Sequence, residues 1–195
     1  MQKKPELVLD IAGVLATNFS PLFWESLSLK YDINYESLKK FKSEIRKNLW
    51  TGMMREEEFW LRLKRRFPLV DIECAKQELQ SNIKPLPAIE KIAFWSEFAN
   101  IHLLSNHCLE WVNPIINPYR KYIKSATISA VVGYCKPEAE IYLKVQSQLQ
   151  DTGRVLFIDD QDKNLVVAKK LGWHTVLADE RGDWMDMITT ILKSL

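Results

Sequence analysis

Five polar residues that could carry chemistry follow short apolar runs in the sequence. Asp10 comes directly after one run, and the others follow two more: Ser105, Asn106, Asp159 and Asp160. Carboxylates serve as nucleophiles or as ligands of hard cations, and hydroxyl and amide groups hydrogen-bond developing negative charge. What these groups can do together depends on whether the fold brings the three run ends to one place.

The runs themselves have the composition of β-strands. They are rich in Val, Ile and Leu, which is typical of strands buried on both faces, and they read ELVLD, IHLLSN, ATISAVVG, RVLFIDD and HTVLAD. Segments with helical spacing lie between them and begin at Pro87, Lys136 and Asp162, the last ending at Gly172. Alternating strands and helices predict an α/β fold with a Rossmann-like parallel sheet. Ligands of such sheets bind beyond the carboxyl ends of the strands, where the polar residues are expected to converge.

One region departs from this alternation. Residues 19–83 contain consecutive amphipathic segments with helical spacing and no strand between them. We therefore predict a small helical domain at 19–83, inserted into an α/β core domain formed by residues 1–18 and 84–195. The segment IKPLP at 83–87 contains two prolines, which favour extended backbone, and predicts the return hinge.

Composition excludes several classes of protein. The 195 residues are 47% hydrophobic and 27% charged, which suits a folded domain rather than a disordered chain. The net charge of +2 comes from 27 basic and 25 acidic residues, so nucleic acid is not an expected partner. The apolar run at the start is too short for a signal peptide or a membrane span, and no membrane association is expected. Three widely spaced cysteines indicate neither a disulfide framework nor a structural zinc site, so a reducing cytoplasm is the expected location.

Four motifs occur in an order that resembles the haloacid dehalogenase (HAD) superfamily of hydrolases, most of which are phosphatases. The resemblance extends over essentially the whole chain and is to the branch whose helical cap is inserted after the first motif. The motifs are matched by Asp10 to Leu15 (DIAGVL), Ser105, Lys136 with Pro137 and Tyr142, and the pair Asp159 and Asp160 followed by Asn164.

This resemblance implies a function and roles for the site residues. The implied activity is a Mg²⁺-dependent phosphatase acting on a small phosphorylated metabolite, with Asp10 forming an aspartyl-phosphate. The implied cation ligands are Asp10, the carbonyl of Ala12 and Asp160. Asp159 is expected either to bind the cation itself or to contact the residues that do. Lys136 is expected to neutralise charge on the nucleophile and the phosphate, and Ser105 and the N–H of Asn106 are expected to bind a phosphoryl oxygen.

Ala12 departs from the family pattern. Most phosphatases of the family have a second aspartate at this position, which protonates the leaving oxygen and then activates water. Its loss leaves two alternatives open: a catalytically silent relative that binds a phosphorylated ligand or a protein partner, and a 2-haloacid dehalogenase, whose halide leaves without a proton. His107 is a hypothetical substitute acid or base, because an imidazole titrates near neutral pH. Substrate identity and oligomeric state are not predictable from the sequence.

Overall fold

A computed structural model describes residues 3–179 and 181–195, and its centre is a parallel β-sheet. The strands are β1 (Glu6–Leu9), β2 (Asn100–Ser105), β3 (Ile123–Ile128), β4 (Val155–Asp159) and β5 (His174–Leu177). Their order is β3-β2-β1-β4-β5, which places β1 in the middle between β2 and β4. The predicted α/β fold with a Rossmann-like parallel sheet is confirmed.

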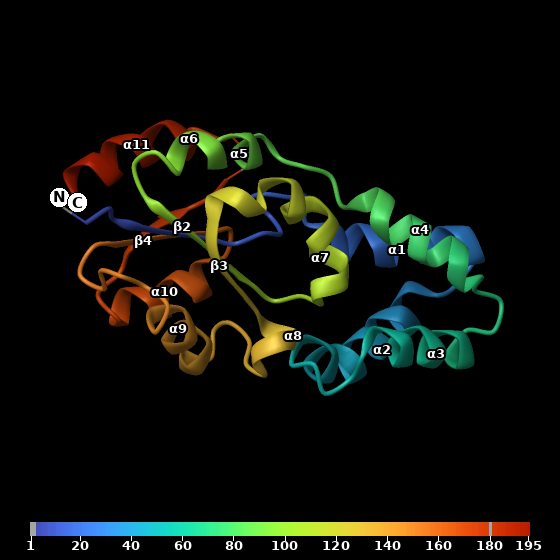
Figure 1. Cartoon of the computed structure of the whole chain (residues 1–195). Coiled ribbons are helices and arrows are strands. Elements are labelled where there is room, and N and C mark those ends of the chain that lie inside the picture. The colour runs from blue at the N-terminus through green and yellow to red at the C-terminus, as the bar shows by residue number, and fades with distance from the viewer. Residues whose placement is uncertain (1–2, 180) are drawn as a thin grey trace.

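Helices cover both faces of the sheet. Successive side chains of a strand point to opposite faces, so Leu7 and Leu9 join one apolar cluster and Val8 joins the other. The first cluster includes residues of α5 (Pro87–Glu90), α6 (Ile92–Trp95), α7 (Leu109–Ile116) and α11 (Trp184–Ser194). The second includes residues of α9 (Ala139–Gln146) and α10 (Asp162–Lys170), which lie on the other side of the sheet in Figure 1. Two short helical elements flank β3: η1 (Asn117–Tyr122) and α8 (Ser129–Val132).

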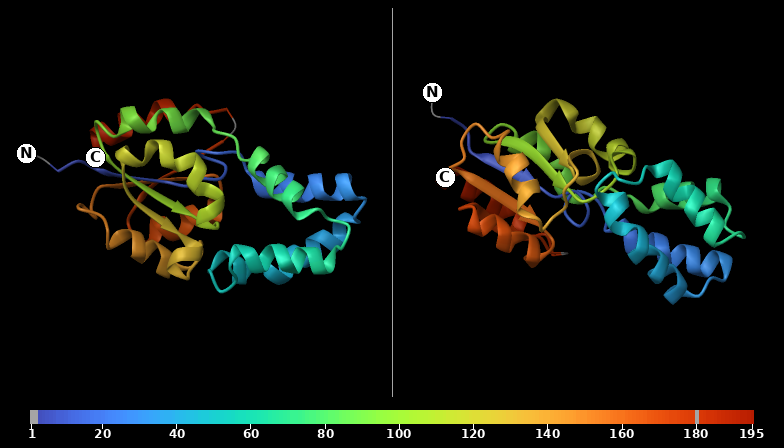
Figure 2. Two further views of the ribbon diagram at one scale, coloured as in Figure 1. Left: turned by 45° about the vertical axis from the view of Figure 1, so that its right-hand side comes forward. Right: turned by 90° about the horizontal axis from the view of Figure 1, so that it is seen from below.

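Four helices follow β1 and its loop. They are α1 (Phe19–Tyr31), α2 (Tyr35–Trp50), α3 (Glu56–Arg66) and α4 (Ile72–Asn82). Apolar spacing explains their packing, because Leu38, Phe41, Ile45 and Leu49 of α2 recur every three or four residues and are all buried. Figure 2 shows these helices extending beyond one end of the sheet. The division into a core domain (1–18 and 84–195) and a helical domain (19–83) stays a prediction.

Three predicted elements have different bounds in the structure, and one of them is the helix expected from Lys136, which begins at Ala139. The helix expected from Pro87 is divided into α5 and α6, because the N–H of Lys91 turns back to the carbonyl of Ala88, three residues earlier, at 3.1 Å. The strand expected over ATISAVVG ends at Ile128, and the chain continues as α8, which Gly133 terminates in a left-handed conformation.

Two of the contacts between the helices of residues 19–83 and the rest of the chain are made by hydrogen bonds. At one, the connecting segments lie side by side, with the N–H of Thr17 donating to the carbonyl of Lys84 at 2.9 Å. At the other, one carboxylate oxygen of Glu56 in α3 accepts the indole N–H groups of Trp60, in the same helix, and Trp111, in α7, each at 2.9 Å. Glu56 therefore joins α3 to α7 through a shared acceptor.

A buried polar network lies at the amino-terminal edge of the sheet. Glu6 is fully buried, and its Oε1 accepts hydrogen bonds from the side chain of Asn100 and from the backbone N–H groups of Gln150 and Asp151, each at 3.1 Å. Its Oε2 lies 2.7 Å from Nε2 of His102. The network joins β1 to β2 and to the loop before β4, at the opposite end of β1 from Asp10.

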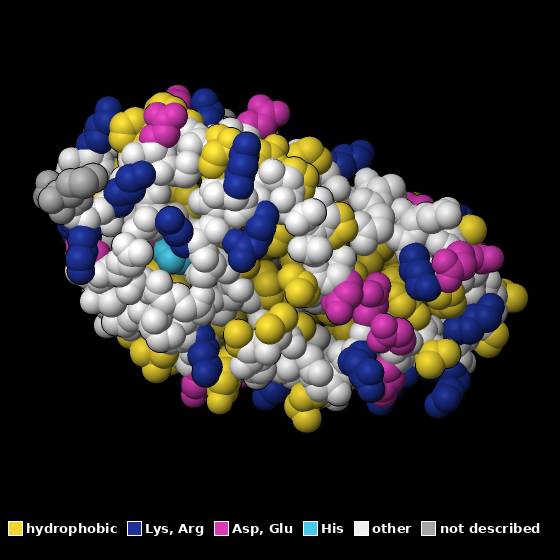
Figure 3. Space-filling view, in the orientation of Figure 1, with side chains coloured by type: hydrophobic (Ala, Val, Ile, Leu, Met, Phe, Trp, Pro, Cys, Tyr) yellow, Lys and Arg dark blue, Asp and Glu magenta, His cyan; other side chains and the backbone are white. Residues whose placement is uncertain are grey.

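The surface shows mixed charge. On the face seen in Figure 3, Lys and Arg side chains are scattered rather than gathered in one stripe. Within residues 3–179 and 181–195, the structure contains no helix with the length and hydropathy that a membrane span needs.

Candidate active site

Asp10 lies at the carboxyl end of β1, on the loop that leads to the helical layer. Its N–H donates to the carbonyl of Ile158 at 2.9 Å, so the hydrogen bonding between β1 and β4 continues up to Asp10. Asp10 is 4% exposed. Its Oδ1 accepts a hydrogen bond from the N–H of Ile11 at 2.7 Å, and its Oδ2 lies 2.8 Å from Nζ of Lys136. Burial, with the nearby charges of Asp159 and Asp160, raises the pKa of Asp10 to about 7 against the opposing attraction of Lys136.

Lys136 lies between two carboxylates. Its Nζ is 2.8 Å from Oδ2 of Asp10 and 2.6 Å from Oδ2 of Asp159. Burial lowers the pKa of Lys136, but the attraction of the two carboxylates together is larger, and the net shift is upward. The side chain is therefore a fixed positive charge beside Asp10.

The side chain of Asn106 fixes the backbone of Lys136. Its Oδ1 accepts the N–H of Lys136 at 2.7 Å, and its Nδ2 donates to the carbonyl of Lys136 at 2.8 Å. This positioning role was not expected from the sequence, because 30 positions separate the two residues. The predicted contact between the N–H of Asn106 and a phosphoryl oxygen stays a prediction.

Asp159 is the last residue of β4, Asp160 follows it, and the two differ in their surroundings. Asp159 is fully buried, and its Oδ1 accepts the N–H of Gln161 at 2.9 Å and the side-chain N–H of Asn164 at 2.8 Å. The hydroxyl of Tyr142 donates to the carbonyl of Asn164 at 2.9 Å, so the third and fourth motifs are joined. Asp159 has its oxygens engaged by protein groups, whereas Asp160 is only partly buried.

The absence of a side chain at Gly13 lets Asp160 lie against the loop that follows β1. The backbone of Gly13 has φ +85°, and a Cβ there would lie 2.5 Å from Cγ of Asp160. Only a residue without a side chain permits this approach. The sequence signal was the glycine that follows Ala12, and its role was not anticipated.

Carboxylate oxygens of Asp10, Asp159 and Asp160 lie within 4.8 Å of one another. Three acidic groups this close repel each other, and burial and Asp159 both raise the pKa of Asp160. An all-oxygen donor set that carries excess negative charge fits Mg²⁺. Ala12, which is mostly buried in the adjoining loop, has only its backbone carbonyl to offer as a ligand.

Ser105 ends β2 as expected. Its hydroxyl is buried and has no hydrogen-bond partner among the residues that the structure describes. Buried hydroxyl groups are normally paired, so an unpaired one at a strand end fits a group that hydrogen-bonds a ligand.

His107 does not have the surroundings of an acid or base. It is 6% exposed, with its ring 4.5 Å from that of Phe19 and 5.9 Å from that of Trp50. Burial, followed by the positive charges of Lys136 and Lys42, lowers the pKa of His107 to about 3. The imidazole is thus neutral near pH 7, which argues against the hypothesis that it replaces the missing aspartate.

No protein-family model matches the chain. A dehalogenase structure has a TM-score of 0.64 and 20% identity, over 94% of this chain and 88% of that one. A HAD family enzyme from Bacteroides thetaiotaomicron, solved with magnesium and inorganic phosphate, has a TM-score of 0.73 and 20% identity, over 94% of this chain and 98% of that one. This chain has the HAD fold.

One curated protein shares sequence with this HAD-fold chain. D-ribitol-5-phosphate phosphatase of Bacteroides thetaiotaomicron is 30% identical over 78 residues, which is 40% of this chain and 38% of that protein. The match therefore spans less than half of either protein. The structural neighbours show the HAD fold over nearly the whole chain.

Proposed function

We propose that this chain is a Mg²⁺-dependent phosphatase that acts on a small phosphorylated metabolite through an aspartyl-phosphate on Asp10. The observation that carries the proposal is the cluster of Asp10, Lys136, Asp159 and Asp160, in which one ammonium joins two buried carboxylates. The relative named as a sugar-alcohol phosphate phosphatase and the HAD family enzyme with magnesium and phosphate support the same chemistry.

The proposed reaction has two steps. A carboxylate oxygen of Asp10 attacks phosphorus, the bond from phosphorus to the ester oxygen breaks, and the leaving oxygen takes a proton from water. A second water then attacks phosphorus and gives a proton to the hydroxide left by the first step, the bond to Asp10 breaks, and inorganic phosphate and free Asp10 are formed. Mg²⁺ held by Asp10, Asp160 and the carbonyl of Ala12 would supply positive charge to the phosphoryl oxygens.

The surrounding residues have distinct tasks in this proposal. Lys136 offsets negative charge on Asp10 and on the phosphoryl group, since its Nζ lies against Asp10. Ser105 donates its hydroxyl to a phosphoryl oxygen. Asp159 holds Lys136 in place, and the helices of 19–83 act as a cap that closes over the substrate.

The test is phosphate release from a panel of phosphate esters with and without Mg²⁺. We expect metal-dependent release that Asp10→Asn abolishes. Lys136→Met is expected to lower kcat by roughly 10²- to 10³-fold, the usual cost of losing one group that stabilises transition-state charge. Lys144→Met, at an exposed position of α9, is the matched control and should behave as wild type. Release that is unaffected by Asp10→Asn would overturn the proposal.

Ala12 lacks the carboxyl group that most phosphatases of the family have at this position, so two other functions are also tested. A silent phospholigand-binding protein would bind inorganic phosphate with Mg²⁺ in calorimetry but release none from any ester. A 2-haloacid dehalogenase would release halide from short 2-haloacids without metal. The acidic cluster weighs against the second, because three neighbouring carboxylates suit a cation and not an unassisted halide displacement.

A further inference from the structure

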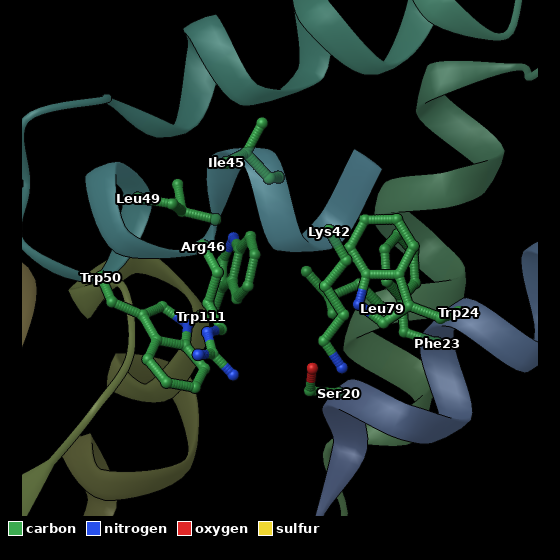
Figure 4. A pocket seen from close by; sticks show the side chains of 10 residues that line it. All are labelled: Ser20, Phe23, Trp24, Lys42, Ile45, Arg46, Leu49, Trp50, Leu79 and Trp111. Carbon is green, nitrogen blue, oxygen red and sulfur yellow. The ribbon is translucent and has the colours of Figure 1, made fainter. Parts of the chain in front are cut away.

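A small pocket separate from the acidic cluster lies among α1, α2, α4 and α7. Its lining is mostly apolar, but two basic side chains, Lys42 and Arg46, extend into it from α2 (Figure 4). The cavity has a volume of about 20 Å³, which is room for one small polar group.

Nothing in the described part of the chain neutralises these two cations. Lys42 and Arg46 are one helical turn apart, and neither has a carboxylate within 4.0 Å or donates a side-chain hydrogen bond to another described residue. Like charges at this spacing repel, and burial followed by Arg46 lowers the pKa of Lys42. A pair of this kind is favourable when an anion lies between the two head groups.

The walls of the pocket suit a ligand that is held in one orientation. The guanidinium of Arg46 lies 5.3 Å from the centre of the Trp50 ring, and Trp111 is a further lining residue. Stacking on an aromatic face fixes the plane of a guanidinium and leaves its N–H groups free for a bidentate acceptor. A carboxylate has the matching planar geometry.

The pocket is adjacent to the proposed catalytic site. The ring of Trp50 lies 5.9 Å from that of His107, which follows Ser105 by two residues. Trp50 lines the pocket and His107 belongs to the segment that follows Ser105, so the pocket borders the segment that carries this proposed phosphoryl-binding residue.

We infer that Lys42 and Arg46 bind a carboxylate of the substrate, which makes the preferred substrate a small phosphate monoester of a carboxylic acid. This inference rests on the proposed phosphatase function. It assigns substrate choice to a cation pair on α2 rather than to the catalytic residues.

The experiment compares two esters that differ at one end. Glycerol 3-phosphate carries a hydroxymethyl group where 3-phosphoglycerate carries a carboxylate. We expect wild-type kcat/KM to favour 3-phosphoglycerate by roughly 10- to 100-fold, the usual size of a charge-assisted contact. The double variant Lys42→Met with Arg46→Met should bring the ratio near one, and Arg46→Lys, which keeps the charge, should retain a preference. Lys40→Met, exposed on the same helix, should keep the wild-type ratio.

A binding measurement separates this inference from the proposed function. Calorimetry with Asp10→Asn and Mg²⁺ gives the affinity for the two esters without turnover. If no ester is hydrolysed by wild type but 3-phosphoglycerate binds more tightly and loses this advantage in the double variant, the phosphatase proposal fails and the carboxylate site stands. If phosphate is released from both esters with no preference, or with a preference that the double variant keeps, the carboxylate site is refuted.

Discussion

The carboxylate of Asp160 lies directly against the backbone of Gly13, so that a methyl group on Gly13 would contact its Cγ at 2.5 Å. The loop that carries Asp10, the proposed nucleophile, and the segment at the end of β4 that carries Asp160 thus meet without an intervening side chain. Gly13→Ala is expected to displace Asp160 and to weaken Mg²⁺ binding by roughly 10- to 100-fold, as changes beside metal ligands do. Calorimetric titration with MgCl₂ measures the change.

Gly172→Ala is the matched control for this change. Gly172 has a similar φ of +81°, but a Cβ there would meet no atom within 4 Å. Both variants are expected to lose about 1–2 kcal/mol of folding free energy from the left-handed backbone. Only Gly13→Ala should lose metal affinity, and equal Mg²⁺ affinity in the two variants would show that the contact with Asp160 is unimportant.

Ala12→Asp is expected to restore the proton donor that the family pattern has at this position. General acid and base catalysis contributes roughly 10²- to 10⁴-fold, so kcat on a phosphate ester should rise toward that range. Ala12→Asn has a similar shape without an ionisable proton and should give no gain. Equal rates for Ala12→Asp and Ala12→Asn would show that the missing carboxyl group does not limit turnover.

His107 is expected to affect acid stability rather than catalysis. Its pKa is lowered from 6.5 to about 3 in the folded chain. As pH falls from 6.5 toward 3, the unfolded chain binds a proton that the folded chain does not, and the folded state loses up to about 1.4 kcal/mol per pH unit. Replacing His107 by Asn removes this contribution, so urea unfolding between pH 6 and 4 should show a shallower pH dependence. The pH profile of kcat should keep its inflections, and a lost inflection would restore the acid–base hypothesis.

Glu6 is expected to matter for stability alone. Its fully buried carboxylate accepts three hydrogen bonds and lies against the ring of His102. Glu6→Leu leaves these groups without their partner. We expect a loss of about 3–5 kcal/mol of unfolding free energy in urea titrations, the usual cost of breaking a buried polar pair. Activity of the folded fraction should remain, because the network is at the far end of β1 from Asp10. Glu140→Leu, at an exposed site in α9, should be nearly neutral.

The polar strand ends were predictable because local pattern and a general rule of parallel sheets act together. Asp10, Ser105 and Asp159 each end an apolar run, and the carboxyl ends of parallel strands meet at one edge. Apolar spacing similarly predicted consecutive helices without a strand over residues 19–83, where the structure has α1 to α4. These features depend on residues close together in the sequence.

Features made by distant side chains were not predictable in this way. Asn106 binds the backbone of Lys136, and Glu6 binds residues nearly a hundred or more positions away, so no short pattern in the sequence indicates either contact. The low pKa of His107 likewise depends on burial against Phe19 and Trp50, which belong to other elements. The local pattern of apolar residues indicates which residues end a strand. Tertiary packing decides what each of their side chains contacts.

The shared acceptor at Glu56 has a consequence for how the helices of residues 19–83 can move. The helical layer is tethered by the backbone beside Thr17, and Glu56 with Trp111 fastens it a second time elsewhere. Any separation of α3 from α7 must release this contact. Release deprives one indole of its carboxylate partner and changes its emission, so tryptophan fluorescence in stopped-flow mixing would report each opening.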